Sequence, residues 1–231
     1  MQTHPVLVCF CFFLLSMPWL HGQENGPSAP AHRLLACDDS PAPGVKPPNM
    51  RCATLVHTRF SSLPEAPIVL RVETFPSTAV ARQSASAASA VVEARGKVWL
   101  LTLASKGKRS SSGHFVTEIG PIPDIGPAPE YELVVSEADF SPAMNPAVSN
   151  AVHTHSGPEI WYVFTGEQCL ETPGGIQRAK AGEGMFAPAE TPMQLNITGT
   201  SSRDALFAIV HDARKPATTA SEWAPKLDCQ K

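Results

Sequence analysis

The sequence predicts an all-β protein, built as an antiparallel sandwich or barrel of short strands. In the last third of the chain, short apolar runs are separated by the turn sequences "SGP", "TGE", "TPGG" and "GTSSRD". Strands and turns at this spacing are typical of antiparallel sandwiches and barrels. The 23 prolines also favour strands and turns over long helices. A chain of 231 residues accommodates one substantial domain or two small ones.

The elements follow from the apolar runs, taken in order. Residues 76–90 predict either a short helix opened by proline or a flexible Ser/Ala loop. Residues 90–103 read as two β-rich runs around Arg95-Gly96, which predicts a hairpin. The remaining expected strands are 66–75, 114–120, 130–138, 150–155, 159–165, 167–172, 185–189, 193–198 and 204–210.

Composition divides the chain into five regions. The first is a secretory signal, and the second is an irregular arm rich in proline. A β-rich region follows, which is either a degenerate barrel half or an extension, and then the barrel and a C-terminal tail. The predicted bounds are 1–22, 23–50, 51–127, 128–214 and 215–231.

The first 22 residues predict export. The run "VLVCFCFFLL" is short for a membrane span and is followed by polar residues after Gly22, as in a cleaved signal. An uncleaved membrane anchor is the alternative. Cleavage near Gly22 would leave a secreted or periplasmic protein with no membrane partner.

Export changes how the cysteines are interpreted. The mature chain keeps Cys37, Cys52, Cys169 and Cys229, and an even number in an oxidising compartment predicts two disulfides with three possible pairings. A Cys37–Cys52 bridge would close a short loop and leave Cys169 to hold the C-terminal tail through Cys229.

The charge of the chain excludes one class of partner. The net charge is −3, only 17% of the residues are charged, and there is no basic excess. We therefore expect no binding to nucleic acid. A small-molecule ligand or substrate is the expected partner.

The segment "HTHSGPEIWYVFTG" (153–166) carries the chemistry. One residue separates His153 from His155, so their side chains point to the same face of a strand. Glu159 opens the returning strand after the "SGP" turn and can face them. Two imidazoles and one carboxylate suit a divalent transition ion, Fe, Mn, Zn or Ni, and leave coordination positions for a ligand. An incidental His-x-His in a hairpin is the alternative.

The spacing His153-x-His155-x3-Glu159-x6-Gly166 resembles the first motif of the cupins. The second cupin motif matches in Gly182 and Pro188. It departs where Glu190 replaces a glycine, where Met193 stands in place of a metal-binding histidine, and where Asn196 falls one position short of the motif asparagine. The resemblance covers about 130–212.

The resemblance implies a fold and a site. The fold is a cupin-like double-stranded β-helix, or jelly-roll barrel, with extra N-terminal strands and a short helix. It implies one divalent transition metal at His153, His155 and Glu159, and a homodimer as is common in cupins. Met193 would face these ligands, and it either forms an apolar wall, binds a soft ion, or marks a site without metal.

The residues around the ligands predict a pocket. Trp161 and Val163 follow Glu159 on the same strand face, and Gln194 is a reserve candidate that points to the opposite face unless the strand bulges. His211 is expected at the rim or surface. The sequence "NIT" at 196–198 is an N-glycosylation sequon, with Asn196 expected to face outward.

Three functions are open at this point. The chain is an exported metal-dependent enzyme of oxygenase, isomerase or lyase type, a non-catalytic module that binds a metabolite or metal, or a structural barrel with a vestigial site. No separate general base is visible in the sequence. No catalytic residue is therefore assigned.

Overall fold

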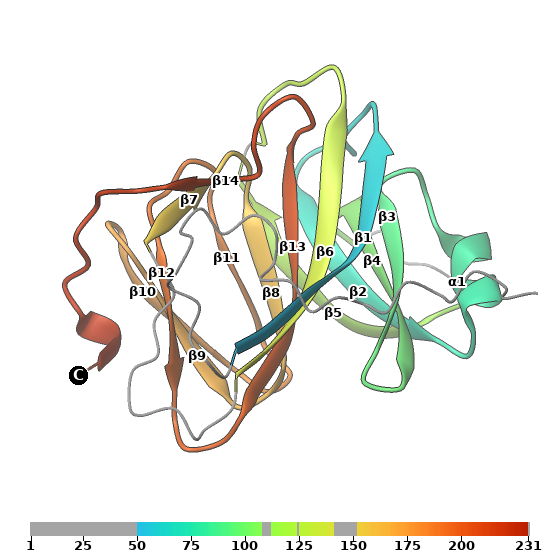
Figure 1. The fold of residues 1–231 in the computed structure, drawn as a ribbon. Coiled ribbons are helices and arrows are strands. Elements are labelled where there is room, and N and C mark those ends of the chain that lie inside the picture. Colours follow the sequence, from blue (N-terminus) through green and yellow to red (C-terminus); the bar gives the residue numbers. More distant parts are fainter. Residues whose placement is uncertain (1–49, 108–111, 124, 141–151, 231) are drawn as a thin grey trace, which may run out of the picture. The chain divides into compact units, whose positions relative to one another are not determined.

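The computed structural model describes residues 50–107, 112–123, 125–140 and 152–230, and these fold almost entirely into β-strands (Figure 1). The predicted signal sequence lies outside the described residues, as does nearly all of the predicted arm. Within the described residues, no helix has the length and apolar character to cross a membrane.

The strands form four hydrogen-bonded sheets. Their orders are β1–β6–β13–β8–β11, β3–β4–β2–β5, β10–β9–β12 and β14–β7. The bounds are β1 Met50–Phe60, β2 Ile68–Phe75, β3 Ser89–Ala94, β4 Lys97–Ser105, β5 His114–Ile122, β6 Tyr131–Phe140, β7 His153–His155, β8 Glu159–Thr165, β9 Glu167–Thr172, β10 Gly175–Lys180, β11 Gly184–Ala187, β12 Gln194–Thr198, β13 Arg203–Asp212 and β14 Thr218–Ala220. The helices are α1 Thr78–Ser84 and the 3-10 turn η1 Asp228–Gln230.

The central strands β6, β13 and β8 of the five-stranded sheet are covered on both faces. One face packs on the four-stranded sheet β3–β4–β2–β5. The other encloses a second apolar cluster with β9, β10 and β12, which we call the barrel core (Figure 1). The barrel core consists of Cys52, Ala138, Phe140, Trp161, Val163, Leu170, Ala179, Met185, Ala187, Met193, Leu195, Ala205, Phe207, Ile209 and Ala217.

This layering explains the composition of β8 and β13. Ile160 and Tyr162 of β8 face the four-stranded sheet, whereas Trp161 and Val163 face the barrel core. A strand that is covered on both sides has no solvent face, so its sequence is nearly continuously apolar instead of alternating. All residues of β13 except the last are buried for the same reason.

The predicted helix and hairpin are present. The helix α1 begins after Ser77, whose side chain accepts a hydrogen bond from Val80 N at 3.3 Å, as an N-cap does. Strands β3 and β4 pair around Arg95 and Gly96, which have φ of 52° and 69°. Two consecutive positive φ angles are typical of the tight turns that match the twist of a hairpin.

Three strands were not predicted from the sequence. Strand β1 pairs along its length with β6, and β14 pairs with β7 beside the histidines. Strand β10 is exposed at every position but Ala179, so its sequence carries no apolar alternation that would reveal it. The structure also buries His211, which was expected at the rim or surface. Its Nε2 lies 3.5 Å from Glu132 Oε2.

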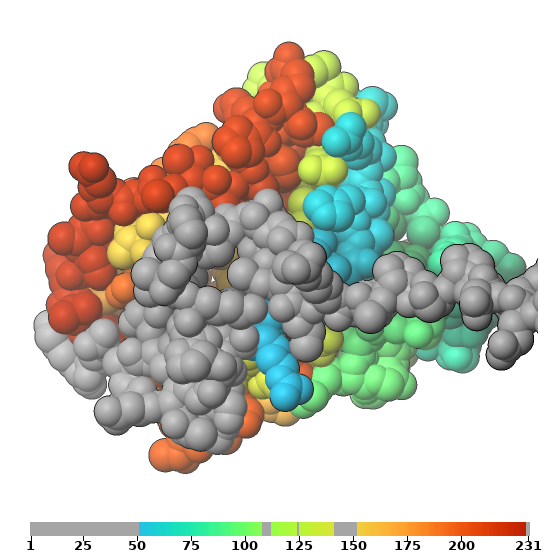
Figure 2. Space-filling view, viewed as in Figure 1, coloured from blue at the N-terminus to red at the C-terminus, as the bar shows by residue number. Residues whose placement is uncertain are grey.

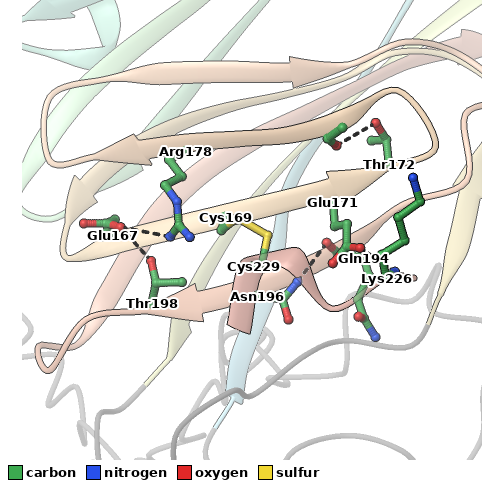
Figure 3. The surroundings of a disulfide bond; sticks show 11 residues. Glu167, Cys169, Glu171, Thr172, Arg178, Gln194, Asn196, Thr198, Lys226 and Cys229 are labelled. Carbon is green, nitrogen blue, oxygen red and sulfur yellow. Dashed lines mark hydrogen bonds and ion pairs between the residues drawn. A yellow bond between two sulfur atoms is a disulfide. The ribbon is translucent and has the colours of Figure 1, made fainter. Parts of the chain in front are cut away.

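The C-terminal segment covers the outer face of β9 and β12. Cys169 and Cys229 form a disulfide across 60 residues of sequence, one of the pairings left open above. The backbone N–H of Lys226 donates to the buried carboxylate of Glu171 (Figure 3). In the space-filling view, the red C-terminal residues lie at the surface of the molecule (Figure 2). Cys52 is also disulfide-bonded. Cys37 lies outside the described residues, so its pairing with Cys52 stays a prediction.

The covering segment changes the interpretation of the sequon. Asn196 points away from the barrel core, as expected, but it is only 1% exposed, and its Nδ2 donates to Gln194 O at 3.3 Å (Figure 3). Because Nδ2 is the atom that would carry a glycan, the outward direction of Asn196 does not make the sequon accessible in the folded chain. The cause is the C-terminal segment, which lies over a strand face that a barrel without it would leave in solvent.

Replacing both Cys169 and Cys229 with Ser should loosen this cover. In the chain-entropy model, a bridge that closes a loop of this length contributes about 4 kcal/mol to the free energy of unfolding. Denaturant unfolding of the double variant should show a loss of roughly that size, and hydrogen exchange should rise at residues 221–230. An unchanged unfolding midpoint and unchanged exchange would show that the bridge does not hold the segment.

Candidate metal centre

Two histidines and a glutamate converge at one end of the barrel core. His153 and His155 lie on β7, and Glu159 opens β8 after the intervening turn. Their potential ligand atoms all lie within 4.8 Å of one another, and all three side chains are buried. Within the described residues, this is the one group of three or more His, Cys, Asp or Glu side chains with such spacing.

Glycine holds the turn that brings these strands together. A Cβ on Gly157 would lie 1.6 Å from the carbonyl oxygen of Val210, so only glycine fits against β13 here. Val210 N also donates to Pro158 O at 3.2 Å, which fixes the turn to the same strand. The turn therefore sets the distance between His155 and Glu159.

The tautomer of His155 follows from its partners. Its Nδ1 lies 3.1 Å from the carbonyl oxygen of Ala217 and 3.0 Å from the hydroxyl of Thr218. A carbonyl oxygen only accepts, so Nδ1 carries the proton. The lone pair of neutral His155 is then on Nε2. A backbone carbonyl or hydroxyl behind the ring is the usual support of a metal-binding histidine.

The Nε2 lone pair of His155 faces two other potential metal-ligand atoms. His153 Nε2 lies at 3.1 Å and Glu159 Oε1 at 3.5 Å. Two ligands each about 2.1 Å from a common ion, at about 90–110° to one another, are separated by about 3.0–3.4 Å. These two separations fit a divalent transition ion, and two imidazoles with one carboxylate are ligands that such an ion binds.

The carboxylate is held in its charged form. Burial alone would raise the pKa of Glu159. When the imidazoles are protonated, the attraction and hydrogen bonding of His155, followed by the attraction of His153, lower the pKa below its usual value. The indole N–H of Trp161 acts in the same direction, although it falls outside hydrogen-bond geometry. A deprotonated carboxylate is the form that binds a metal ion.

Met193 lies directly opposite His153. The two residues exchange backbone hydrogen bonds, His153 N to Met193 O at 3.2 Å and Met193 N to His153 O at 2.9 Å. Residues paired in this way place their side chains on the same face. Met193 is fully buried in the barrel core. The motif position before it, Glu190, has a left-handed φ of 56°, which explains why glycine is the residue of the cupin pattern there.

Some of the predicted pocket residues face the barrel core, and others face away from it. Trp161 and Val163 are buried in the barrel core on the same face as Glu159. Gln194 lies on the opposite face, paired with Glu171 of β9 and outside the barrel core. His114 is exposed at the start of β5, in the four-stranded sheet, and takes no part in the cluster.

Sequence reasoning missed three residues in and near the site. Ala217 and Thr218 support His155 from residues assigned to the C-terminal tail, and the short "TTA" strand gives no signal of its own. Arg203 is the largest fully buried side chain in the described residues. Its alternation with Ala205, Phe207 and Ile209 is a signal that places it inside the barrel.

The comparison with known proteins found similar solved structures only. No family model matches the sequence, and no curated protein matches it. A cupin superfamily protein from Desulfitobacterium hafniense is 14% identical and aligns over 35% of this chain and 68% of its own, with a TM-score of 0.30. A cupin 2 conserved barrel domain protein from Salinispora arenicola is 23% identical over 36% and 65%, with a TM-score of 0.30.

An oxalate decarboxylase variant from Bacillus subtilis is 16% identical over 38% of this chain and 23% of its own, with a TM-score of 0.32. At such identity a likeness concerns the fold alone. The strand order, the enclosed barrel core and the spacing of the first motif give the described chain a cupin-like, all-β barrel fold.

Proposed function

We propose that the chain is an exported, metal-dependent cupin-like enzyme that acts on a small molecule in its barrel. His153, His155 and Glu159 would hold one divalent transition ion. The observation that carries this proposal is the orientation of His155, whose Nδ1 is engaged by Ala217 so that its Nε2 lone pair faces the other two donors. Export is supported by the Cys169–Cys229 disulfide, since such bridges persist in oxidising compartments.

The residues present define what the site supplies. Three protein ligands leave coordination positions open, and a bound ion there would act as a Lewis acid or present oxygen to a chelating substrate. The apolar wall that includes Met193 and Val163 excludes water from one side of the ligands. Oxygenase, isomerase and lyase chemistry all use such a set. The homodimer implied by the cupin resemblance stays a prediction.

A non-catalytic binding module is the second candidate. Met193 fills the place of the cupin histidine and lies fully buried beside His153, so the barrel core is packed at this point. A module would purify with a tightly held organic ligand, whereas an enzyme would hold an exchangeable ion. Mass spectrometry of the native protein, with elemental analysis of the same sample, separates these two functions.

Metal titration tests the proposed site. The full chain, stripped with a chelator, should bind about one Mn(II) or Zn(II) per molecule by isothermal titration calorimetry. His155→Ala should abolish binding, because two remaining ligands seldom hold an ion against water.

His114→Ala is the matched control, since His114 is exposed and lies in a different sheet, and its affinity should equal that of the wild type. Equal metal affinity in His155→Ala and the wild type would refute the assignment of the site.

A further inference from the structure

Arg203 places a cation inside the barrel. It alternates with Ala205, Phe207 and Ile209 on the face of β13 that lines the barrel core, and it has no exposed surface. Its partner across the ladder is Phe140 of β6. A buried charge costs stability unless it is paired. The partners of the guanidinium therefore need to be accounted for.

The guanidinium lies over two aromatic rings. Its central carbon lies 4.4 Å from the centre of the Phe140 ring and 4.9 Å from that of Trp161. One edge is used as well, because Nη1 donates to Ala138 O at 3.0 Å. Nε and Nη2 have no hydrogen-bond partner in the described part of the chain. These two donors lie side by side on one edge of the planar group.

The same edge is occupied by a carboxylate in two other arginines of this chain. Nε and Nη2 of Arg71 lie 3.3 Å and 3.1 Å from Glu118 Oε1. Those of Arg214 lie 3.0 Å and 2.7 Å from the two carboxylate oxygens of Asp212. Arg203 is the most buried of the three, and its edge is the one without a carboxylate.

A second buried polar group lies in the barrel interior. Gln168 has no exposed surface, and neither its Nε2 nor its Oε1 has a partner among the described residues. It alternates with Leu170 of the barrel core, and its neighbours across the sheet are Ala179 and Ile197, which also pack there. Its side chain therefore points into the interior that Arg203 enters.

The β8–β9 turn connects the two groups. Gly166 in this turn packs so closely on Arg203 that a Cβ on it would lie 2.8 Å from Arg203 Cα. Gln168 follows two residues later. The Nε–Nη2 edge of Arg203 and the amide of Gln168 both lie in the buried barrel interior, where polar groups call for a polar partner.

The charge of Arg203 selects the kind of group. Burial lowers the pKa of Arg203 to about 9, while the nearby carboxylates of Asp204, Glu159 and Asp139 act against this shift. The guanidinium is thus a cation at neutral pH. Glu159 shares the barrel interior, so a ligand that adds a single negative charge is favoured over one that adds two.

We propose that the Nε–Nη2 edge of Arg203 binds a carboxylate group of the barrel's ligand, so that the ligand class is small carboxylic acids. The binding of a carboxylate at Arg203 stands on the geometry of the arginine alone. That small carboxylic acids are also the substrates of the metal centre rests on the proposed function. In that case the ligand bound by Arg203 also reaches the ion at His153, His155 and Glu159.

Acetate, succinate and inorganic phosphate are the probes. They are titrated into the full chain after metal removal, so that the result does not depend on the metal site. Acetate should bind, and inorganic phosphate should bind more weakly than acetate because its charge at neutral pH is more negative and Glu159 lies in the same interior. Succinate, a dianion, should also bind, but more weakly than acetate. In Arg203→Met the affinity for both carboxylates should fall by at least roughly tenfold, since two charge-assisted hydrogen bonds are lost.

Two further variants separate ligand binding from folding. Arg203→Lys keeps the positive charge but loses the two parallel N–H donors of the guanidinium, and it should also bind carboxylates more weakly. Arg71→Met removes a buried arginine whose edge is already paired, so it should lower the melting temperature without changing carboxylate affinity. Arg203→Met should melt at the wild-type temperature or above it, because it removes unpaired buried donors.

Addition of Mn(II) to the wild type should raise the affinity for succinate and leave the affinity for acetate nearly unchanged. This result would link the two sites. If Mn(II) has no effect on either probe, the carboxylate site stands and its link to the metal centre fails. Absence of carboxylate binding to the metal-free wild type, or equal affinity in Arg203→Lys and the wild type, would overturn the proposal even if the metal binds. Tighter binding of phosphate than of acetate would overturn the ligand class.

Discussion

Replacing Gly157 with Ala should unfold the turn that joins the histidines to the glutamate. The added Cβ would lie 1.6 Å from Val210 O, 2.6 Å from Val210 C and 2.9 Å from His211 Cα. These are backbone atoms of a strand buried on both faces, so they cannot move aside as a flexible side chain can. The turn itself must leave β13, and His155 and Glu159 then separate.

The expected loss in the free energy of unfolding is about 3 kcal/mol or more, at the upper end of overpacking effects. Metal binding should be lost in the same variant. Denaturant unfolding and calorimetric metal titration measure the two effects.

Gly174→Ala is the matched control. Gly174 also lies in a turn between two strands, but its Cβ would meet only the hydroxyl of Thr172, at an ordinary 3.6 Å. Its stability should stay within about 0.5 kcal/mol of the wild type. A Gly157→Ala variant with wild-type stability and wild-type metal affinity would show that the turn does not pack on β13 as described.

Replacing Met193 with His should raise the affinity for metal. Met193 shares a face with His153, so an imidazole at this position adds a fourth nitrogen or oxygen donor to the set. A neutral nitrogen donor binds Zn(II), Fe(II) or Mn(II) far better than a thioether does. Because the two side chains have similar volumes, the barrel should accept the change at modest cost. We expect a gain of at least roughly tenfold, about 1.4 kcal/mol, by calorimetric titration.

Met185→His is the control for this gain. Met185 is also buried in the barrel core, on β11 opposite Trp161, but it does not pair with a metal-ligand candidate. Its replacement should bring no increase in affinity. If Met193→His keeps the wild-type circular dichroism spectrum and the wild-type affinity, the side chain at residue 193 does not reach the other donors.

The sequence predicted the parts of the fold that carry a local signal. The hairpin at Arg95-Gly96 follows from turn chemistry, and the structure confirms it. For residues 76–90 the sequence left a proline-opened helix and a Ser/Ala loop open, and the structure has a helix over Thr78–Ser84. The cluster at 153–159 follows from the two-residue period of a strand. Elements fixed by long-range packing left no such signal. Strand β10 is polar along its length and forms only because it pairs with β9.

The same reasoning explains the errors at single residues. Asn196 was expected in solvent because its strand phase is outward, but a disulfide 33 residues later in the chain brings a segment over it. Gly157 was recognised only as part of a turn, since its contact with Val210 joins residues far apart in sequence. Arg203 was assigned to the turn before the strand expected at 204–210. In the structure it is the first residue of β13, and the rings of Phe140 and Trp161 surround its guanidinium.

The most direct test of the metal centre is anomalous X-ray scattering from crystals of the full chain grown with Mn(II) or Zn(II), recorded at the absorption edge of the added metal. The account predicts one strong anomalous peak per chain, bonded to Nε2 of His153, Nε2 of His155 and the carboxylate of Glu159. The Nδ1 of His155 should still contact Ala217 O. An ordered barrel with no peak among these three side chains, or with its strongest peak elsewhere, would contradict the account.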